Sequence, residues 1–108
     1  MLNQEQLNQK LEESPSQKKL TPDLLKSKIA KAEFSRLNET LTVAVITTVN
    51  GFHIVGKSAC ADPANYNQEI GEKVAYDDAF KQLWSLEGYL LREEISKEVG
   101  YQPTAQAA

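Results

Sequence analysis

One histidine and one cysteine are the side chains in this sequence with the clearest capacity for covalent chemistry. A neighbouring imidazole can deprotonate a thiol, so His53 and Cys60 together could form a nucleophile and its base. In the strand pairing predicted below, however, the two side chains point to opposite faces of a sheet. We therefore expect His53 at the surface and Cys60 packed as a small apolar residue, with no enzymatic activity.

The scarcity of cysteine and histidine also limits metal and redox chemistry. A single cysteine excludes an intrachain disulfide. Together with a single histidine it leaves too few nitrogen and sulfur ligands for a zinc site within one chain. No apolar run approaches the ~18 residues that a membrane span needs. The sequence therefore predicts no cofactor, no metal and no membrane partner, in a reducing cytoplasm.

A polar loop, residues 62–66, is the strongest candidate for ligand binding. Asp62 precedes Pro63, which is typical of a turn or a helix cap. The helix expected next would begin with free backbone N–H groups, which favour anions such as phosphates. Tyr66 offers a flat surface for a base or a hydroxyl for a hydrogen bond. The plain alternative is a short structured connection, since the spacing matches neither a P-loop nor a dinucleotide fingerprint.

A β-hairpin is the element that must position this loop. β-branched residues dominate residues 40–49 and favour a strand. Asn50-Gly51 then predicts a two-residue type I′ turn, which pairs Val49 with Phe52. In this register the core face of the first strand carries Leu41, Val43, Val45, Thr47 and Val49. The second strand adds a shallow strip where a helix backbone could approach closely, formed by Gly56, Ser58 and Cys60.

Helical patterns flank the hairpin on both sides. Thr21 is a suitable N-cap before Pro22, and apolar spacing extends that helix to about Asn38. A second helix is expected over residues 68–84, and a third, capped by Ser85, over residues 86–99. The predicted fold is α+β: an N-terminal helix, a two-stranded antiparallel hairpin, and two C-terminal helices packed on one hairpin face. Flexible tails, residues 1–20 and 101–108, flank this single domain of residues 21–100.

Charge is divided along the chain, although the net charge is only −3. Residues 18–37 hold six basic and two acidic side chains, whereas residues 61–100 hold nine acidic and four basic ones. Segments of opposite sign attract each other within or between protomers. The alternative is that both are ordinary solvated helix faces. The negative net charge and the few aromatic residues argue against DNA or RNA as partners.

The expected fold is small for a self-sufficient protein, which favours oligomers. Two strands alone are marginally stable. A domain of this size also buries a limited fraction of its surface. The open edges of the hairpin could pair with a symmetry mate. We therefore expect a homodimer or a homotetramer.

Several short stretches together resemble a known family. They are Asn50-Gly51-Phe52, Ser58 to Tyr66, Glu69-Ile70-Gly71, Ala75-Tyr76, Ala79 and Trp84 to Arg92. They resemble a widespread family of small tailed-phage proteins, called after the N-four gp-forty-nine and Sf-six gp-sixty-six products. The Thr21-Pro22 helix start matches too, and the resemblance covers residues 21–95. Ser85 stands where members often have Pro. Glu72 stands where members often have a basic residue, which weakens the case for an anion at that helix turn.

This resemblance implies a phage accessory protein that acts in the host bacterial cytoplasm, and it implies little about chemistry. By analogy with other small phage proteins, we expect an oligomeric sponge that counters host defence by sequestering a cyclic nucleotide immune signal. The alternative is a protein–protein interaction module that inhibits or redirects a host protein. The candidate ligand-binding residues are Asp62, Asn65, Tyr66, Lys73, Trp84, Tyr89 and Arg92.

Overall fold

The computed structural model describes residues 1–13 and 18–100, apart from the side chain of Leu11. The expected C-terminal tail, residues 101–108, lies outside the described residues. In chain order the elements are α1 (Gln4–Glu12), α2 (Pro22–Ser27), β1 (Ile29–Arg36), β2 (Leu41–Thr48), β3 (His53–Ala59), the 3-10 turn η1 (Pro63–Asn65) and α3 (Gln68–Val99).

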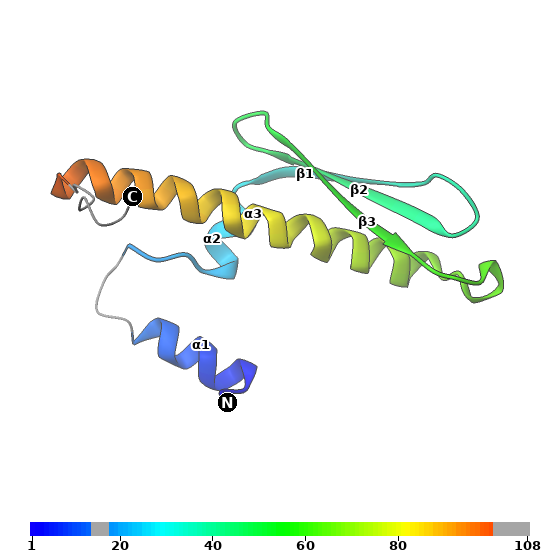
Figure 1. Ribbon diagram of the computed structural model, residues 1–108, viewed down its shortest axis with the longest axis horizontal. Helices are drawn as coiled ribbons and strands as arrows, with labels where there is room; N and C mark the ends of the chain where they lie inside the picture. The colour runs from blue at the N-terminus through cyan, green and yellow to red at the C-terminus, as the bar shows by residue number, and fades with distance from the viewer. Residues whose placement is uncertain (14–17, 101–108) are drawn as a thin grey trace, which may run out of the picture.

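The domain has two layers, a three-stranded antiparallel sheet and the long helix α3 (Figure 1). The strand order is β1-β2-β3, so the middle strand is β2. α3 contacts β2 and β3 on one face, and the described elements leave the opposite face uncovered. No described helix is both long enough and apolar enough to cross a membrane. The α+β class is confirmed, with one strand more than expected.

The core lies between α3 and the even-numbered side of β2 and β3. The buried apolar side chains are Leu25, Ala44, Ile46, Ile54, Ala75, Ala79 and Leu83. Small residues dominate where the layers meet. A Cβ atom on Gly56 would overlap the carbonyl oxygen of Ala75 and lie 2.8 Å from the Cβ of Ala79. Gly56 therefore allows the helix backbone to rest directly on β3, as the sequence predicted for this strip.

The hairpin register differs from the prediction by one residue. The amide of Thr48 donates to the carbonyl of Phe52, and Ala44 lies opposite Gly56. The predicted type I′ turn needs positive φ at two residues, but among the described turn residues only Gly51 has it, at 88°. The loop thus holds three residues, and the shift turns the other side of β2 toward the core.

Thr42, Ala44, Ile46 and Thr48 are consequently the buried side of β2. The expected core face was wrong. Leu41, Val43, Val45 and Thr47 lie half-buried on the open face of the sheet, and Val49 is exposed in the loop. The even side of β3 was predicted correctly, since Ile54 and Gly56 are buried.

The first helix is much shorter than expected. The hydroxyl of Thr21 accepts from the amide of Leu24, which confirms the predicted N-cap. The helix ends at Ser27, however, and residues 29–36 form β1 instead of two further turns. Ala and Lys in this segment favour a helix by intrinsic propensity. Pairing with the free side of β2 outweighs that weak preference, and it adds the third strand.

The two expected C-terminal helices are one continuous helix of 32 residues. Ser85 lies exposed within α3 and caps nothing in the described structure, because neither proline nor a turn interrupts the backbone there. At ~1.5 Å per residue, α3 is about 48 Å long. Gly100 ends it in the left-handed conformation, at φ 64°, so the helix stops at Val99, where the sequence predicted the last helix to end.

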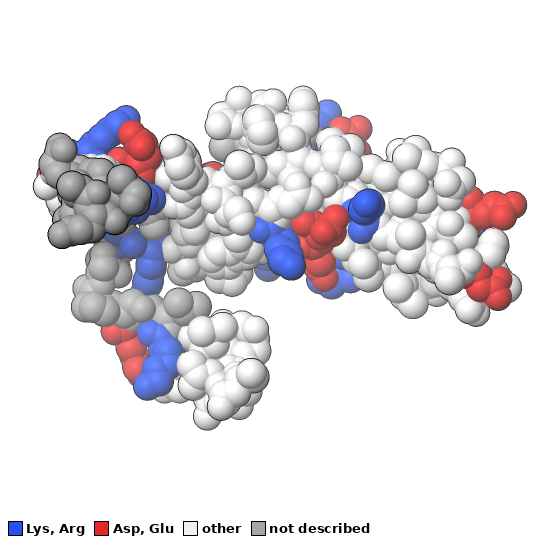
Figure 2. Space-filling model, viewed as in Figure 1, with Lys and Arg blue, Asp and Glu red and all other residues white. Residues whose placement is uncertain are grey.

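The basic and acidic segments of the chain meet within the protomer. Lys18 pairs with Glu98, and the Nζ atom of Lys28 lies 3.8 Å from a carboxylate oxygen of Glu87. Both pairs join the segment before β1 to the distal half of α3. On the face shown in Figure 2, basic side chains lie mostly beside acidic ones, with wide uncharged areas between them. Two ion pairs thus join the segments, while other charged side chains pair within α3, as Lys73 does with Asp77.

The close approach at Gly56 yields a stability prediction. Gly56→Ala should lower the free energy of unfolding by about 3 kcal/mol, because the new methyl group meets backbone atoms of α3 that cannot move aside. Gly88→Ala is the control, since its Cβ would meet only a side-chain carbon of Leu20, at 3.8 Å. That change should stabilise α3 by about 0.5–1 kcal/mol. Urea unfolding of both variants measures the difference, and equal stabilities would contradict this packing.

Candidate functional site

The polar groups of the loop predicted to bind a ligand make local hydrogen bonds that cap helices. The carboxylate of Asp62 accepts from the amide of Ala64 at 3.0 Å and caps η1. The side chain of Asn67 accepts from the amide of Ile70 at 3.1 Å and caps α3. The cap by Asp62 was expected from the sequence. The two caps fix the loop as a short structured entrance to the long helix.

Tyr66 joins this loop to the sheet. Its hydroxyl lies 3.2 Å from the hydroxyl of Thr42, and the guanidinium of Arg36 stacks 3.7 Å from its ring centre. Arg36 also donates to the backbone carbonyls of Asn38 at 3.2 Å and Glu39 at 2.7 Å. A cation over an aromatic ring stabilises this end of the sheet by about 1 kcal/mol. Both groups could recognise a nucleotide, but here each has the other as its partner.

A small cavity of about 50 Å³ lies beside Tyr66, between the sheet and the start of α3. Its lining residues are Thr40, Thr42, Ser58, Cys60, Asn65, Tyr66, Asn67, Ile70 and Gly71. Ligand pockets usually have about 300–1,000 Å³. This cavity alone is therefore far too small for a nucleotide.

His53 and Cys60 lie at opposite ends of β3 and have different surroundings. His53 is exposed on the open face, where its Nδ1 lies 3.0 Å from the hydroxyl of Thr47. Cys60 is half-buried at the small cavity, and its thiol lies 3.6 Å from the carbonyl oxygen of Asp62. The two side chains make no catalytic pair.

The remaining candidate residues are spread along α3. Lys73 is exposed and pairs with Asp77 at 2.7 Å, while Trp84 is half-buried and meets Phe80 edge-on. Tyr89 and Arg92 are exposed on the distal half of the helix. At ~1.5 Å per residue, Lys73 and Arg92 are about 28 Å apart along the axis. One protomer therefore does not bring the predicted ligand-binding residues together.

The structure instead forms a larger groove at the opposite end of the sheet, under the loop between β2 and β3. Its volume is about 350 Å³. We call it the tip groove, lined by Lys28, Thr48, Val49, Asn50, Phe52, Leu83, Leu86, Glu87, Tyr89 and Leu90. Among the candidate residues named from the sequence, it includes only Tyr89.

Large apolar side chains around the tip groove remain open to solvent. Tyr89 is 76% exposed, Val49 62% and Phe52 56%, and Leu86 and Leu90 are each a little over 40% exposed. Val49 and Phe52 belong to the hairpin loop, whereas the other three follow helical spacing on α3. Side chains far apart in the sequence thus form one apolar rim.

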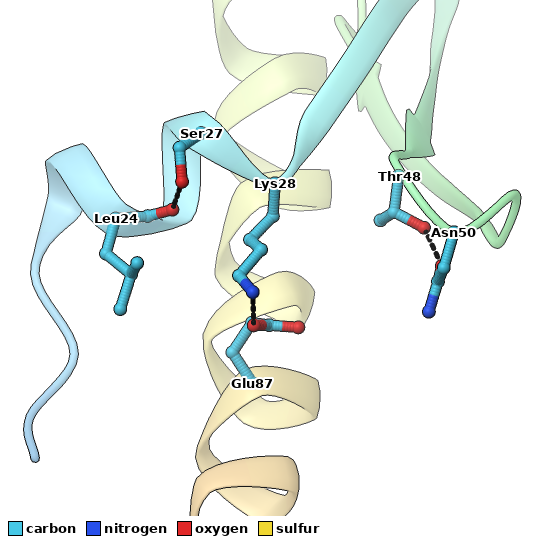
Figure 3. A network of polar contacts seen from close by, with 6 residues as sticks. All are labelled: Leu24, Ser27, Lys28, Thr48, Asn50 and Glu87. Atoms are coloured by element: carbon cyan, nitrogen blue, oxygen red, sulfur yellow. Dashed lines mark hydrogen bonds and ion pairs between the residues drawn. The ribbon is translucent and has the colours of Figure 1, made fainter.

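Polar contacts fix the two walls of the tip groove. Lys28, at the end of α2, reaches across to Glu87 on α3 (Figure 3). On the loop side, the hydroxyl of Thr48 donates to the side-chain oxygen of Asn50 at 2.6 Å. The same hydroxyl accepts from the amide of Phe52 at 3.0 Å. The apolar side chains are therefore presented on a hydrogen-bonded loop and a rigid helix.

The sequence held one signal for this groove that the prediction did not use. Hairpin loops are usually rich in Gly, Asn, Asp, Ser and Pro. Here Val49 and Phe52 flank Asn50-Gly51, so large apolar residues stand at a hairpin tip. Their partners on α3 could not be identified, because the sequence predicted a helix break at Ser85 and so assigned Leu86, Tyr89 and Leu90 to a separate helix.

The charged side chains of the described residues form no candidate metal site. Among residues 1–13 and 18–100, no group of three or more His, Cys, Asp or Glu side chains could hold a metal ion. Two acidic side chains in these regions are instead paired with lysines, Glu87 with Lys28 and Asp77 with Lys73.

Comparison with known proteins identifies the family but adds no described relative. Neither the curated proteins nor the solved structures gave a significant match. A family model matches residues 20–95, which include α2, the whole sheet and most of α3. The matched part thus contains both the small cavity and the tip groove. The chain belongs to the phage protein (N4 Gp49/phage Sf6 gene 66) family.

Proposed function

We propose that this phage protein acts without catalysis, by binding another protein through the tip groove. The observation that carries the proposal is the apolar rim of Val49, Phe52, Leu86, Tyr89 and Leu90, all exposed around one groove. Scattered single apolar residues are normal on a protein surface, whereas contiguous ones mark interaction sites. An accessory protein of this kind would inhibit or redirect a host protein.

The chemistry of the rim suits a peptide or helix with large apolar anchors. Aromatic side chains such as Phe52 and Tyr89 are enriched among residues that dominate binding energy. Their loop and helix are already ordered, so little conformational entropy is lost when a partner binds. The Lys28–Glu87 pair at the edge of the groove offers both a donor and an acceptor to polar groups of that partner.

The same residues argue for a non-enzymatic role. The ionisable side chains that line the tip groove are Lys28, Glu87 and Tyr89. Lys28 and Glu87 are paired with each other, and the rest of the lining is apolar or amide and hydroxyl groups. Such a site has no activated nucleophile and no pair of acid and base poised on a common atom.

Sequestration of a cyclic nucleotide is a second candidate function, favoured by a different observation. Arg36 and Tyr66 place a guanidinium and an aromatic ring in contact beside the start of α3. These are the groups that bind phosphates and stack on bases. Because the cavity there is about 50 Å³, a nucleotide site requires a second copy of the chain to complete it.

Two matched substitutions test the tip groove. Leu90→Ser removes a rim side chain that is 45% exposed, and Val74→Ser removes one that is 46% exposed elsewhere on α3. Leu90→Ser should weaken binding of a host protein at least about tenfold, because a buried anchor contributes about 1.4 kcal/mol or more. Val74→Ser should leave binding unchanged. Affinity capture from a host lysate, followed by titration of the purified partner, measures both. Equal capture by the two variants would remove the groove from the proposal.

Calorimetry against a panel of cyclic nucleotides tests the second candidate. If the protein sequesters such a signal, the wild type should release binding heat with at least one of them. Tyr66→Ala then tests the candidate residues near the start of α3, and Arg92→Ala tests those on its distal half. At least one of these substitutions should abolish the binding heat. The absence of heat with every nucleotide, beside specific capture of one host protein, would refute sequestration.

A further inference from the structure

Among the described residues, side chains of α3 form hydrogen bonds with one outer edge of the sheet, at β3, but not with the other, at β1. Along β3, the amide of Lys57 donates to the carboxylate of Asp78 at 2.9 Å. The side-chain amide of Gln82 donates to the carbonyl of Val55 at 2.7 Å. Asp78 and Gln82 are four residues apart on α3, so one flank of the helix closes this edge. A strand edge that is satisfied in this way cannot accept another strand.

The edge formed by β1 has no such cover among the described residues. In the described structure β1 makes substantial contact only with β2 and α2, and residues 30–36 are exposed. The amide of Leu37 donates to the carbonyl of Leu41, which fixes the alternation of hydrogen-bonded pairs along this ladder. From Lys31 onward the odd-numbered residues of β1 therefore bond β2, and the backbone groups of Ala32 and Phe34 point outward. A register shift between Ile29 and Lys31 marks the start of this regular part of the ladder.

We propose that β1 pairs antiparallel with β1 of a second copy, around a two-fold axis at Ala32. In this arrangement Ala32 of each copy exchanges two backbone hydrogen bonds with Ala32 of the other. Phe34 then lies opposite Ala30 of the second copy. The product is a continuous six-stranded sheet with both α3 helices on the same face. This inference does not depend on the tip groove, which lies at the loop between β2 and β3.

Charge selects this register from its neighbours. Lys31 and Glu33 lie on the open face of the sheet, and both side chains are largely exposed. The Nζ atom of Lys31 lies 3.2 Å from a carboxylate oxygen of Glu33. Pairing around Ala32 places Lys31 of each copy opposite Glu33 of the other, so two ion pairs form across the axis. If the two-fold axis moved by one residue to position 33, Glu33 would lie opposite Glu33 of the second copy. If it moved to position 31, Lys31 would lie opposite Lys31. Like charges directly opposite each other destabilise a strand pair.

The apolar side of β1 also favours a second copy. Phe34 is 38% exposed on the helix face of the sheet, beyond the area that α3 covers. The partner strand would extend the surface beside this ring. Because Asp78 and Gln82 face the β3 edge, the row of Tyr76, Phe80 and Trp84 lies on the opposite flank of α3. In the dimer the two aromatic rows would border a channel whose floor is the paired β1 strands.

Charge reversal tests the partner and the register together by sedimentation velocity at micromolar concentrations. The wild type should be dimeric, while Lys31→Glu and Glu33→Lys should each weaken self-association about tenfold or more. An equimolar mixture of the two variants should form heterodimers, because every opposed pair then has opposite signs. The double variant, Lys31→Glu with Glu33→Lys, should dimerise again. A monomeric wild type, or single variants that dimerise like the wild type, would overturn the proposal.

Cross-linking then tests the position of the axis independently of charge. Hydrogen-bonded residues across an antiparallel pair have Cα atoms about 5.5 Å apart, which is within disulfide range. In a Cys60→Ser background, Ala32→Cys should therefore cross-link rapidly under mild oxidation. Ala30→Cys is the matched control, because its own symmetry mate lies about four residues away along the strand. Faster cross-linking by Val43→Cys, on the open face, would instead indicate a face-to-face dimer and refute edge pairing.

Discussion

The close contact between α3 and the sheet at Gly56 determines the arrangement of the whole domain. Because the backbone of α3 lies directly over β3, only small side chains fit between them at Ala75 and Ala79. The helix is thereby held at one height and one rotation. The two flanks of the helix therefore face different parts of the sheet. On one flank, Asp78 and Gln82 form hydrogen bonds with the edge of β3. The row from Tyr76 to Trp84 lies on the side of β1.

The length of α3 separates two regions with different chemical character. At its start, Tyr66, Arg36 and Thr42 form a compact polar junction with a cavity too small for a nucleotide. Further along, apolar side chains from the helix and the hairpin loop surround the tip groove. A single protomer thus exposes an apolar surface at the tip groove, whereas the cavity at its polar junction has no room for a nucleotide.

The sequence predicted local features better than pairings between segments. The N-cap at Thr21, the cap at Asp62 and the end of the last helix at residue 99 each depend on a few neighbouring residues, and each was recognised. Gly56 was correctly expected at a helix contact. The register failed because Asn50-Gly51 fits two loop lengths, and only long-range packing decides between them. β1 was taken for a helix because its strand conformation depends on β2, which local propensity does not describe.

The candidate site was predicted less well for the same reason. Residues 62–66 were expected either to bind a ligand or to form a short structured connection. Arg36 was assigned to a helix, so its contact with Tyr66 could not be predicted. The tip groove joins residues almost forty positions apart, such as Val49 and Leu86, so the apolar residues of the hairpin tip signal one wall of the groove but not the other. Sites assembled between distant segments need the correct register before they can be found.

The three-residue loop after Thr48 has a consequence for how this family can vary over time. One residue more or fewer at the tip would reverse one strand relative to the other. Either Val43 and Val45 would then replace Ala44 and Ile46 under α3, or Gly56 would leave its contact with the helix. Relatives should therefore conserve the length of this tip. Insertions should accumulate instead between Arg36 and Leu41, where the chain turns without α3 above it.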